Sequence, residues 1–384
     1  ADETPRWPGS HKRKASQWHG MMTSTCAAGN GHLSEGFHRG LASDSEVVLI
    51  RTINSKGHIT DAAIQRALDW VEKNHEEFGI KVVNLSVSAD PVREFAENPI
   101  DNSINRLVQQ GVVVTAAAGN EGVRRLNPPA TSPSALTVGG IDDKNTFDRK
   151  QIKLWHSNFG SGGGGVHKPE IVAPSLWVVS CIMPGSQVEE EAQDLFQDPE
   201  ANQERILSLK LVSPHYKHVD GPSFAAPIVA SACACIMEAC PGIAPHSIRE
   251  ALIKTAQTVK DADEARQGHG VVRPGLALAY AVDHFHQHKT HVVSTPHLEN
   301  GRVTFLYHDH SAGVVEIAGS WDRWKEKLEM VNVEPGIWKL DIKRPRSGTH
   351  YYKFILNRNQ WVDDPANPLK EPDHVGGFNS VLKV

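Results

Sequence analysis

Residues 112–122 read Val-Val-Val-Thr-Ala-Ala-Ala-Gly-Asn-Glu-Gly, a short apolar run that ends in turn residues. The run is typical of a strand buried in a sheet, and Gly119 marks its end. Further strand-like runs (46–53 and 82–87) and helical spacings (60–74 and 103–110) alternate with it along the chain. This alternation predicts an α/β fold, a parallel sheet flanked by helices, with its chemistry at the carboxyl ends of the strands.

A serine precedes the most apolar segment of the chain. Residues 220–227, Asp-Gly-Pro-Ser-Phe-Ala-Ala-Pro, place Ser223 directly before a small-residue run, 224–237, that predicts a buried helix. Because proline is favoured in the first turn of a helix, Pro227 predicts that this helix begins close to Ser223. Ser223 would then lie at the positive end of the helix dipole, where free N–H groups suit an oxyanion. An isolated serine at this position is more often a helix cap, so a nucleophile needs further support.

A histidine and an asparagine supply that support. His19 opens a second small-residue segment, His-Gly-Met-Met-Thr-Ser-Thr, and is the candidate general base for the serine hydroxyl. Asn120 follows the strand 112–118, where its amide is either a turn residue or a donor to an oxyanion. Ser223 lacks a glycine two residues later, which argues against the nucleophile elbow of lipase-type hydrolases.

The order of these segments is similar to that in subtilases. The matching segments are His19-Gly20, Ala116–Gly122 and Gly221–Pro227, together with Asn84-Leu85-Ser86 and Ile171-Val172-Ala173-Pro174. The resemblance covers about residues 15–280. It implies a subtilisin-like fold and a serine endopeptidase in which Ser223 is the nucleophile, His19 the base and Asn120 the oxyanion donor.

The same resemblance implies where a polypeptide substrate binds. Ser86, Val87 and Ser88 would pair with the substrate backbone as an added strand. The pocket for the side chain before the scissile bond would be lined by Ala117, Ala118 and Gly119.

The third catalytic residue is missing from the pattern. Subtilases carry an aspartate on a strand roughly thirty residues before the histidine. Here only residues 1–18 precede His19; they form no apolar strand, and Asp2 is their sole aspartate. We therefore expect the acid to lie in an absent N-terminal piece. The alternative is a catalytically impaired subtilase fold that serves as a glucan-binding or scaffold protein.

A second domain is expected over residues 291–384, after a peptidase domain over 1–290. Five short strand-like runs, around Val303, Val314, Trp338, Tyr352 and Val381, are separated by Gly and Pro. This spacing predicts an all-β, immunoglobulin-like sandwich.

Residues 314–324, Val-Val-Glu-Ile-Ala-Gly-Ser-Trp-Asp-Arg-Trp, resemble the glycogen-binding modules of the AMP-activated kinase β subunit and of glucan-branching enzymes, a domain type similar to the isoamylase N-domain. The resemblance continues through 351–354, 360–365 and 378–380. It implies that Trp324 and Trp361 stack on glucose rings and that Lys353 and Asn379 hydrogen-bond to hydroxyl groups. Alternatively, the two tryptophans fill the core of the sandwich.

The composition narrows the partners. The 384 residues carry 40 Lys plus Arg against 45 Asp plus Glu, a net charge of −5, which predicts neither nucleic acid nor anionic membrane as a partner. No apolar run approaches the roughly 18–20 residues of a membrane span. Polypeptide substrate and, at the second domain, α-glucan are the partners expected. The compartment is left open.

No cofactor is expected, and no metal site is assigned. The five Cys residues show no metal-ligand spacing and predict no disulfide framework. The glycine run 161–165 predicts a flexible loop, and the acidic stretch 186–204 a solvated insertion, with structural calcium as its alternative. The His-rich stretch 283–295 predicts a linker rather than a metal site, although it contains His284, His286, His288 and His291.

Overall fold

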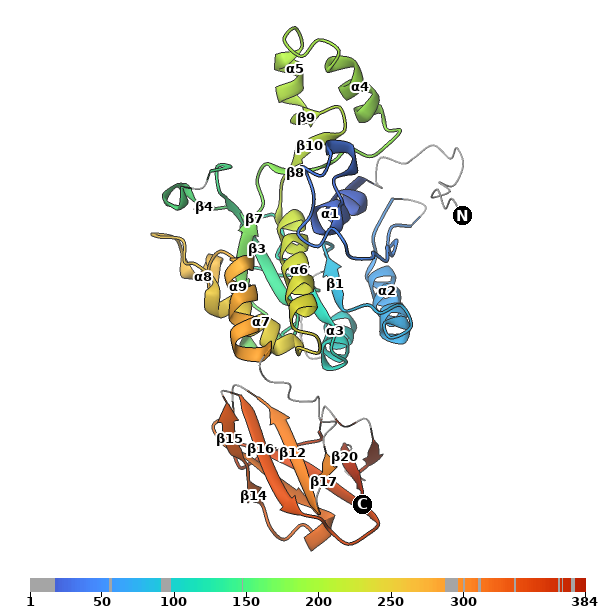
Figure 1. Cartoon of the computed structure of the whole chain (residues 1–384), viewed down its shortest axis with the longest axis vertical. Helices are drawn as coiled ribbons and strands as arrows, with labels where there is room; N and C mark the ends of the chain where they lie inside the picture. The colour runs from blue at the N-terminus through green and yellow to red at the C-terminus, as the bar shows by residue number, and fades with distance from the viewer. Residues whose placement is uncertain are drawn as a thin grey trace. The chain divides into compact units, whose positions relative to one another are not determined.

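The computed structural model describes residues 18–54, 57–90, 98–146, 148–286, 296–299, 301–309, 312–334, 336–364, 367, 369–373 and 377–384. The chain forms two compact units, residues 1–288 and 289–384, each with its own core (Figure 1).

The first unit is built on a parallel sheet with the strand order β1-β2-β3-β7, and the short β4 runs antiparallel to β3. The strands are β1 (Val82–Leu85), β2 (Val113–Ala117), β3 (Leu136–Asp142), β4 (Lys153–Leu154) and β7 (Ile171–Pro174). Side chains alternate between the two faces of a strand. In β2, Val113 therefore joins one core, whereas Val114 and Ala116 join the core on the other face. The predicted parallel α/β sheet is confirmed.

Helices cover both faces of this sheet (Figure 1). One face carries α6 (Pro222–Ala239), α7 (Pro245–Thr255) and α9 (Pro274–Ala281), and the other carries α2 (Asp61–Asn74) and α3 (Pro99–Gln109). Thr60 caps α2 by accepting the Ala63 N–H at 3.2 Å. The helix α1 (Trp18–Ala28) lies against α6, where Ser231 Oγ donates to the Ala27 carbonyl at 2.8 Å.

One expected strand does not form. Residues 46–50 adopt no strand, and Val47, Val48, Leu49 and Ile50 are between 39% and 69% exposed. An apolar run becomes a strand only when a neighbouring strand completes its hydrogen bonds. Within the described residues β1 is the outer strand of the sheet and pairs only with β2, so the segment 46–50 has no such neighbour.

The helix α6 has a property that was not expected from the sequence. Over its 18 residues it is long and apolar enough to cross a membrane by length and composition. In the structure 61% of it is buried, and it packs on β1, β2, β3 and β7. Its apolar character is therefore used in the core of the first unit.

The acidic stretch 186–204 is folded rather than irregular. It contributes α4 (Gln187–Leu195) and the start of α5 (Gln203–Ser208), which lie between β8 (Val178–Cys181) and the hairpin of β9 (Leu211–Ser213) and β10 (Tyr216–Val219). Glu191 pairs with Arg205 at 2.6 Å, and Glu189 contacts His215 at 3.2 Å. No group of three His, Cys, Asp or Glu side chains that could hold a metal ion occurs in the described part of the chain, and the calcium alternative stays a prediction.

Two other segments also differ from expectation. The glycine run 161–165 begins at the last residue of β5 (Gly160–Ser161), which pairs with β6 (His167–Lys168). Gly162 is buried, and a Cβ there would be 2.7 Å from the Thr131 carbonyl. Only glycine fits there, so this part of the run is packed. The expected linker begins with a helical turn, Val282–His286, that continues α9, while residues 287–295 lie outside the described residues. His284 Nδ1 is 2.9 Å from the Tyr280 carbonyl, and the two rings stack at 3.8 Å.

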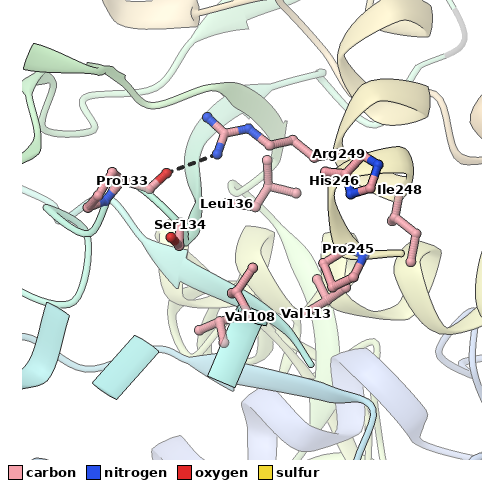
Figure 2. Close-up of a pocket in the computed structure, with 10 residues that line it drawn as sticks. Val108, Val113, Pro133, Ser134, Leu136, Pro245, His246, Ile248 and Arg249 are labelled. Carbon is pink, nitrogen blue, oxygen red and sulfur yellow. Dashed lines mark hydrogen bonds between the residues drawn. The ribbon is translucent and has the colours of Figure 1, made fainter. Parts of the chain in front are cut away.

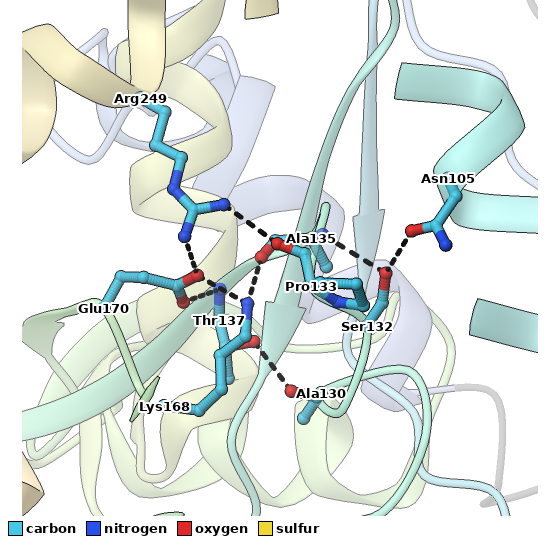
Figure 3. A network of polar contacts seen from close by, with 9 residues as sticks. All are labelled: Asn105, Ala130, Ser132, Pro133, Ala135, Thr137, Lys168, Glu170 and Arg249. Carbon is cyan, nitrogen blue, oxygen red and sulfur yellow. Dashed lines mark hydrogen bonds and ion pairs between the residues drawn. The ribbon is translucent and has the colours of Figure 1, made fainter. Parts of the chain in front are cut away.

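A buried ionic network ties β3 to the segment before β7 and to α7 (Figure 3). Glu170 accepts the Lys168 ammonium at 2.5 Å, the Arg249 guanidinium at 2.6 Å and the Thr137 N–H at 2.8 Å. Lys168 is fully buried, and burial lowers its pKa to about 8 against the opposing effect of Glu170. The carboxylate of Glu170 therefore lies between two cations inside the unit, and the buried Asp101 carboxylate also acts on Lys168.

The second unit consists of two antiparallel sheets. One contains β11 (His297–Glu299), β12 (Arg302–His308), β16 (Ile337–Lys343) and β15 (Val331–Glu334). The other contains β14 (Leu328–Glu329), β13 (Val315–Gly319), β17 (Thr349–Leu356), β20 (Phe378–Lys383), β19 (Lys370–Pro372) and β18 (Gln360–Val362). Phe305 and Trp338 from the first sheet pack with Tyr352 and Phe354 from the second. The predicted β-sandwich is confirmed.

Candidate active site

His19 and Ser223 lie on two helices that pack together. His19 occupies the first turn of α1, and its ring centroid is 5.7 Å from that of Phe224, the residue after Ser223. Met22, one turn further along α1, also packs against Phe224. The packing of α1 on α6 therefore places the predicted base beside Phe224, the residue that follows the predicted nucleophile.

The start of α6 differs from the sequence-based expectation. Pro222 holds the first helical position, and Pro227 lies inside the helix, so the prediction that Pro227 marks the first turn was wrong. A proline inside a helix has no N–H for the carbonyl four residues earlier, which here belongs to Ser223. Ser86 Oγ donates to that carbonyl instead, at 2.7 Å. This hydrogen bond, which the sequence did not indicate, ties the end of β1 to the nucleophile.

Asn120 lies beside the residue that begins α6. Gly221 caps the helix with a φ of 117°, a backbone conformation that favours glycine. A Cβ at Gly221 would be 3.3 Å from Asn120 Oδ1, so the Asn120 amide packs directly over this glycine. Ser223 N–H belongs to the first turn of α6 and has no acceptor within the helix. The predicted role of Asn120 as an oxyanion donor together with this N–H stays a prediction.

Two residues that sequence reasoning missed hold the turn that carries Asn120. Asn158 accepts the Glu121 N–H at 2.8 Å and donates its own N–H to the Gly119 carbonyl at 3.1 Å. The ring of His156 has its Nδ1 2.9 Å from the Asn120 carbonyl. Both residues lie in the segment 155–160, which has no helical or strand period, so only their long-range contacts disclose the role.

The electrostatic surroundings of His19 favour its neutral form. Burial lowers the pKa of His19 below its ordinary value. In the described part of the chain the structure gives its ring no hydrogen-bond partner, and no carboxylate contributes to the pKa shift. Asp2, the only aspartate before His19 in the sequence, lies outside the described residues. A neutral imidazole can accept the proton of Ser223, but nothing described orients it.

This environment predicts a pH dependence. Because the pKa of His19 is lowered, the neutral base persists to more acidic pH, and the rate of Ser223 acylation should reach half its maximum below pH ~6.5, the ordinary histidine value. The rate of labelling by a fluorophosphonate, measured from acidic to neutral pH, checks this. A midpoint well above that value would show instead that a carboxylate lies beside His19.

The end of β1 lies beside Ser223, as the substrate-strand prediction requires. The Ser86 hydroxyl donates to the Ser223 carbonyl, and the Val87 side chain packs toward the core under α2 and α3. Ser88 Oγ accepts the Asn127 amide at 3.4 Å. Their side chains are therefore engaged by the protein, and a substrate would pair with backbone groups of this segment.

The end of β2 carries the three residues predicted for the pocket. Ala117 packs toward the core under α6, whereas Ala118 packs with Leu126 and Ala130. Gly119 has a φ of 102°, and a Cβ there would be 2.7 Å from Asn158 Nδ2. The predicted role of these residues in substrate binding stays a prediction.

A separate cavity of about 220 Å³ lies at the opposite ends of the strands (Figure 2). Val113, at the start of β2, and Leu136, at the start of β3, line it together with Ile248 and Arg249 of α7. The Arg249 guanidinium donates to the Pro133 carbonyl at 3.0 Å and to Glu170. Because the cavity lies at the starts of β2 and β3, it is distinct from the opposite end of the sheet, where Ser223 lies.

The residues predicted to bind sugar lie on the outer side of the six-stranded sheet of the second unit. The rings of Trp324 and Trp361 are 6.2 Å apart, and Trp361 is 43% exposed. Trp361 pairs with Ile355, two residues from Lys353 on β17. The core is filled by other aromatic residues, including Trp338, so the structure does not use Trp361 as core packing.

The two polar residues of this surface, Lys353 and Asn379, differ in their burial and their partners. Lys353 is largely buried, and its ammonium pairs with Asp373 at 2.5 Å. Asn379, on β20, is half-buried and neighbours Ser380, which pairs with Tyr352. Lys353 and Asn379 thus point to the same side of adjacent strands. A hydroxyl would reach the Lys353 ammonium only alongside Asp373.

An α/β sheet that presents a serine, a histidine and an amide donor at one edge has the arrangement of a serine hydrolase. The family model described as "Subtilase family" matches residues 2–270, and the chain belongs to this family. A second model, "Glycogen recognition site of AMP-activated protein kinase", matches residues 302–384. The protein thus combines a subtilisin-like protease domain with a glycogen-binding module.

Curated relatives are similar over the protease domain. The chain is 28% identical over 265 residues to serine protease AprX of Bacillus subtilis (strain 168). The matched region covers 66% of this chain and 56% of the relative. It is 25% identical over 253 residues to an alkaline protease of Alkalihalobacillus alcalophilus, covering 66% and 53%. The chain spans little more than half the length of these relatives.

Solved structures show the same fold. A structure of the prenylagaramide maturation protease PagA has a TM-score of 0.51 at 19% identity and covers 68% of this chain and 82% of that one. A structure of the patellamide maturation protease PatA has a TM-score of 0.51 at 21% identity, covering 69% and 84%. At these identities the likeness establishes the subtilisin-like fold alone.

Proposed function

We propose that the first unit is a serine endopeptidase that hydrolyses peptide bonds through an acyl-enzyme. Ser223 Oγ attacks the carbonyl carbon while the His19 imidazole takes its proton, and the Asn120 amide and Ser223 N–H hold the oxyanion. His19 then protonates the leaving amine and activates the water that releases the acyl group. The observation that carries this proposal is the meeting of three segments, 18–28, 119–122 and 221–224, at one edge of the sheet.

The acid that orients His19 is proposed to arrive on an additional strand from outside the described residues. Three observations support it: β1 has a free edge within the described residues, residues 46–50 expose four apolar side chains, and a cavity of about 390 Å³ lies between residues 50–54 and α2. An extended segment pairing with β1 would use the free backbone groups and cover the apolar ones. A carboxylate side chain at the carboxyl end of this added segment would lie at the same end of the sheet as His19.

The second unit is proposed to bind α-glucan through Trp361 and Trp324, with Asn379 as a hydrogen-bonding partner. A sugar ring presents C–H groups that pack on an exposed indole, and Trp361 is exposed on this surface. The module would then place the protease domain on glycogen or starch.

Replacing Trp361 by alanine should weaken binding to amylose by about tenfold, because the exposed indole supplies the stacking face. Retention of the full chain on an amylose column, or a binding isotherm with a soluble glucan, checks this. Trp70→Ala, which removes a tryptophan of similar exposure (36%) from α2, is the matched control. Equal retention of wild type and Trp361→Ala would remove this tryptophan from the proposed site.

A second candidate function is a glucan-binding protein whose protease domain is inert. The observation that favours it is the absence, among the described residues, of a carboxylate beside His19. Losing the aspartate alone costs a subtilisin about 3 × 10⁴ in turnover. Such a chain would bind glucan with hardly any peptidase activity.

One experiment separates the two candidates. Hydrolysis of a denatured protein is measured with the protein from its native source and with the 384-residue chain, each with and without a fluorophosphonate. Fluorophosphonate-sensitive hydrolysis by the native protein supports the endopeptidase. No hydrolysis by either preparation, with amylose binding intact, would overturn it in favour of the glucan-binding protein.

A further inference from the structure

An exposed tryptophan lies next to the segment that leads to the nucleophile. Trp177 follows β7, and its backbone N–H donates to Asp220 Oδ1 at 3.0 Å. Two residues earlier, the Ser175 carbonyl accepts the Gly221 N–H at 2.6 Å. The segment 175–177 therefore runs along Asp220 and Gly221, directly before Ser223.

The Trp177 side chain is held in place although it is 38% exposed. The Lys210 ammonium lies 4.7 Å from the centre of its ring, and the His218 ring meets it at 5.1 Å and 84°. His218 Nδ1 also lies 2.7 Å from the Trp177 carbonyl. Trp177 has a φ of 57°, a left-handed conformation that is rare for a bulky side chain and is maintained only by surrounding contacts. An indole fixed in this way and left open to solvent is arranged for contact with another molecule.

The order of the strands places Trp177 relative to a substrate. The sheet runs β1-β2-β3-β7, and the segments predicted to bind residues before the scissile bond follow β1 and β2. Trp177 follows β7, at the other end of this order, with Ser223 reached through Asp220 and Gly221. A polypeptide that enters over the ends of β1 and β2 and passes Ser223 leaves over Trp177.

We propose that Trp177 is a specificity-determining residue that binds a large apolar side chain, aromatic or branched aliphatic, on the leaving-group side of the scissile bond. This inference rests on the proposed endopeptidase function. The chemistry follows from the groups around the ring. The Lys210 ammonium is paired with Asp220, so these two charges balance each other, and the indole is the apolar group that the site presents. Covering an indole with an apolar side chain removes both surfaces from water.

The test is a set of peptides with identical residues before the scissile bond and Phe, Leu, Glu or Gly in the two positions after it. The value of kcat/KM is measured for wild type, Trp177→Ala, Trp177→Phe and, as a control that removes an exposed aromatic ring elsewhere, Phe37→Ala. We expect wild type to prefer Phe and Leu over Gly by about tenfold. In Trp177→Ala this preference should shrink to about twofold with the Gly peptide unaffected, and Trp177→Phe and Phe37→Ala should keep it.

Two results would overturn the proposal. An equal loss for all four peptides would mean that Trp177 only supports the fold, and a selective loss for the Glu peptide would mean that the site reads charge. The same comparison can be made without turnover. Fluorescently labelled versions of the four peptides are bound to Ser223→Ala and to Ser223→Ala/Trp177→Ala, and binding is measured by fluorescence anisotropy. A retained apolar preference in binding, without any fluorophosphonate-sensitive hydrolysis by wild type, would refute the endopeptidase and leave Trp177 as a binding residue.

Discussion

His19→Ala is expected to slow the acylation of Ser223 by about 10²–10⁴-fold, because a general base contributes a factor of this size. The serine hydroxyl is a poor nucleophile while it keeps its proton, and the His19 ring lies beside Phe224 at the start of α6. The rate constant for fluorophosphonate labelling, followed by intact mass, measures the effect directly and does not require a known substrate.

The control for this variant is His32→Ala. His32 is exposed and lies just beyond α1, so its removal should leave the labelling rate unchanged. If His19→Ala labelled as fast as wild type, the base would have to be another group, and the assignment of α1 to the catalytic site would be wrong.

Glu170→Gln should lower the free energy of unfolding by about 3–5 kcal/mol, the usual cost of removing one partner from a buried ion pair. The variant leaves the fully buried Lys168 ammonium and the Arg249 guanidinium without their shared carboxylate (Figure 3). Urea unfolding of the chain, followed by circular dichroism, measures this loss. The matched control is Glu72→Gln, which breaks the exposed pair with Arg106 at 2.7 Å and should cost less than about 1 kcal/mol.

The sign of the pH dependence follows from Lys168. Its folded pKa, about 8, is below the ordinary value of 10.5, so the unfolded chain binds more protons between these values and stability rises with pH across them. Removing Glu170 takes away an effect that raises this pKa, so the folded pKa falls further. The destabilisation should therefore be smaller at pH 9 than at pH 7. Equal stability of Glu170→Gln and wild type at pH 7 would contradict the buried network.

The predicted part of the active site rests on local signals. A serine before an apolar helix, a histidine before a small-residue helix and an asparagine after a strand each follow from short-range rules. Their order along the chain indicated the subtilase resemblance, and the packing of α1 on α6 places His19 beside Phe224, the neighbour of Ser223. Local pattern was sufficient here because each residue lies at the end of a regular element.

The failures came where a distant contact decides the structure. The run 46–53 has the composition of a strand, yet residues 46–50 remain exposed because no described strand lies beside them. Pro227 sits inside α6 because Ser86, far away in sequence, satisfies the carbonyl that the proline leaves free. His156 and Asn158 act through bonds to the Asn120 turn. Neither periodicity nor composition encodes such contacts.

The sugar-binding surface was predicted only in part from the sequence. The spacing of five short strand-like runs, separated by Gly and Pro, identified β12, β13, β16, β17 and β20 from the sequence. The pairing of Lys353 with Asp373 was not foreseen, because the partner comes from beyond β19 and only the folded sheet brings them together. Its consequence is that Trp361 and Asn379, rather than the Lys353 ammonium, are the more accessible groups.

The most direct test of Ser223 as the nucleophile is to locate a fluorophosphonate adduct in the full chain by peptide mass mapping. We predict one adduct per chain, on Ser223, that forms more slowly in His19→Ala and is absent from Ser223→Ala. An adduct on any other serine, or equal labelling of Ser223→Ala, would contradict it.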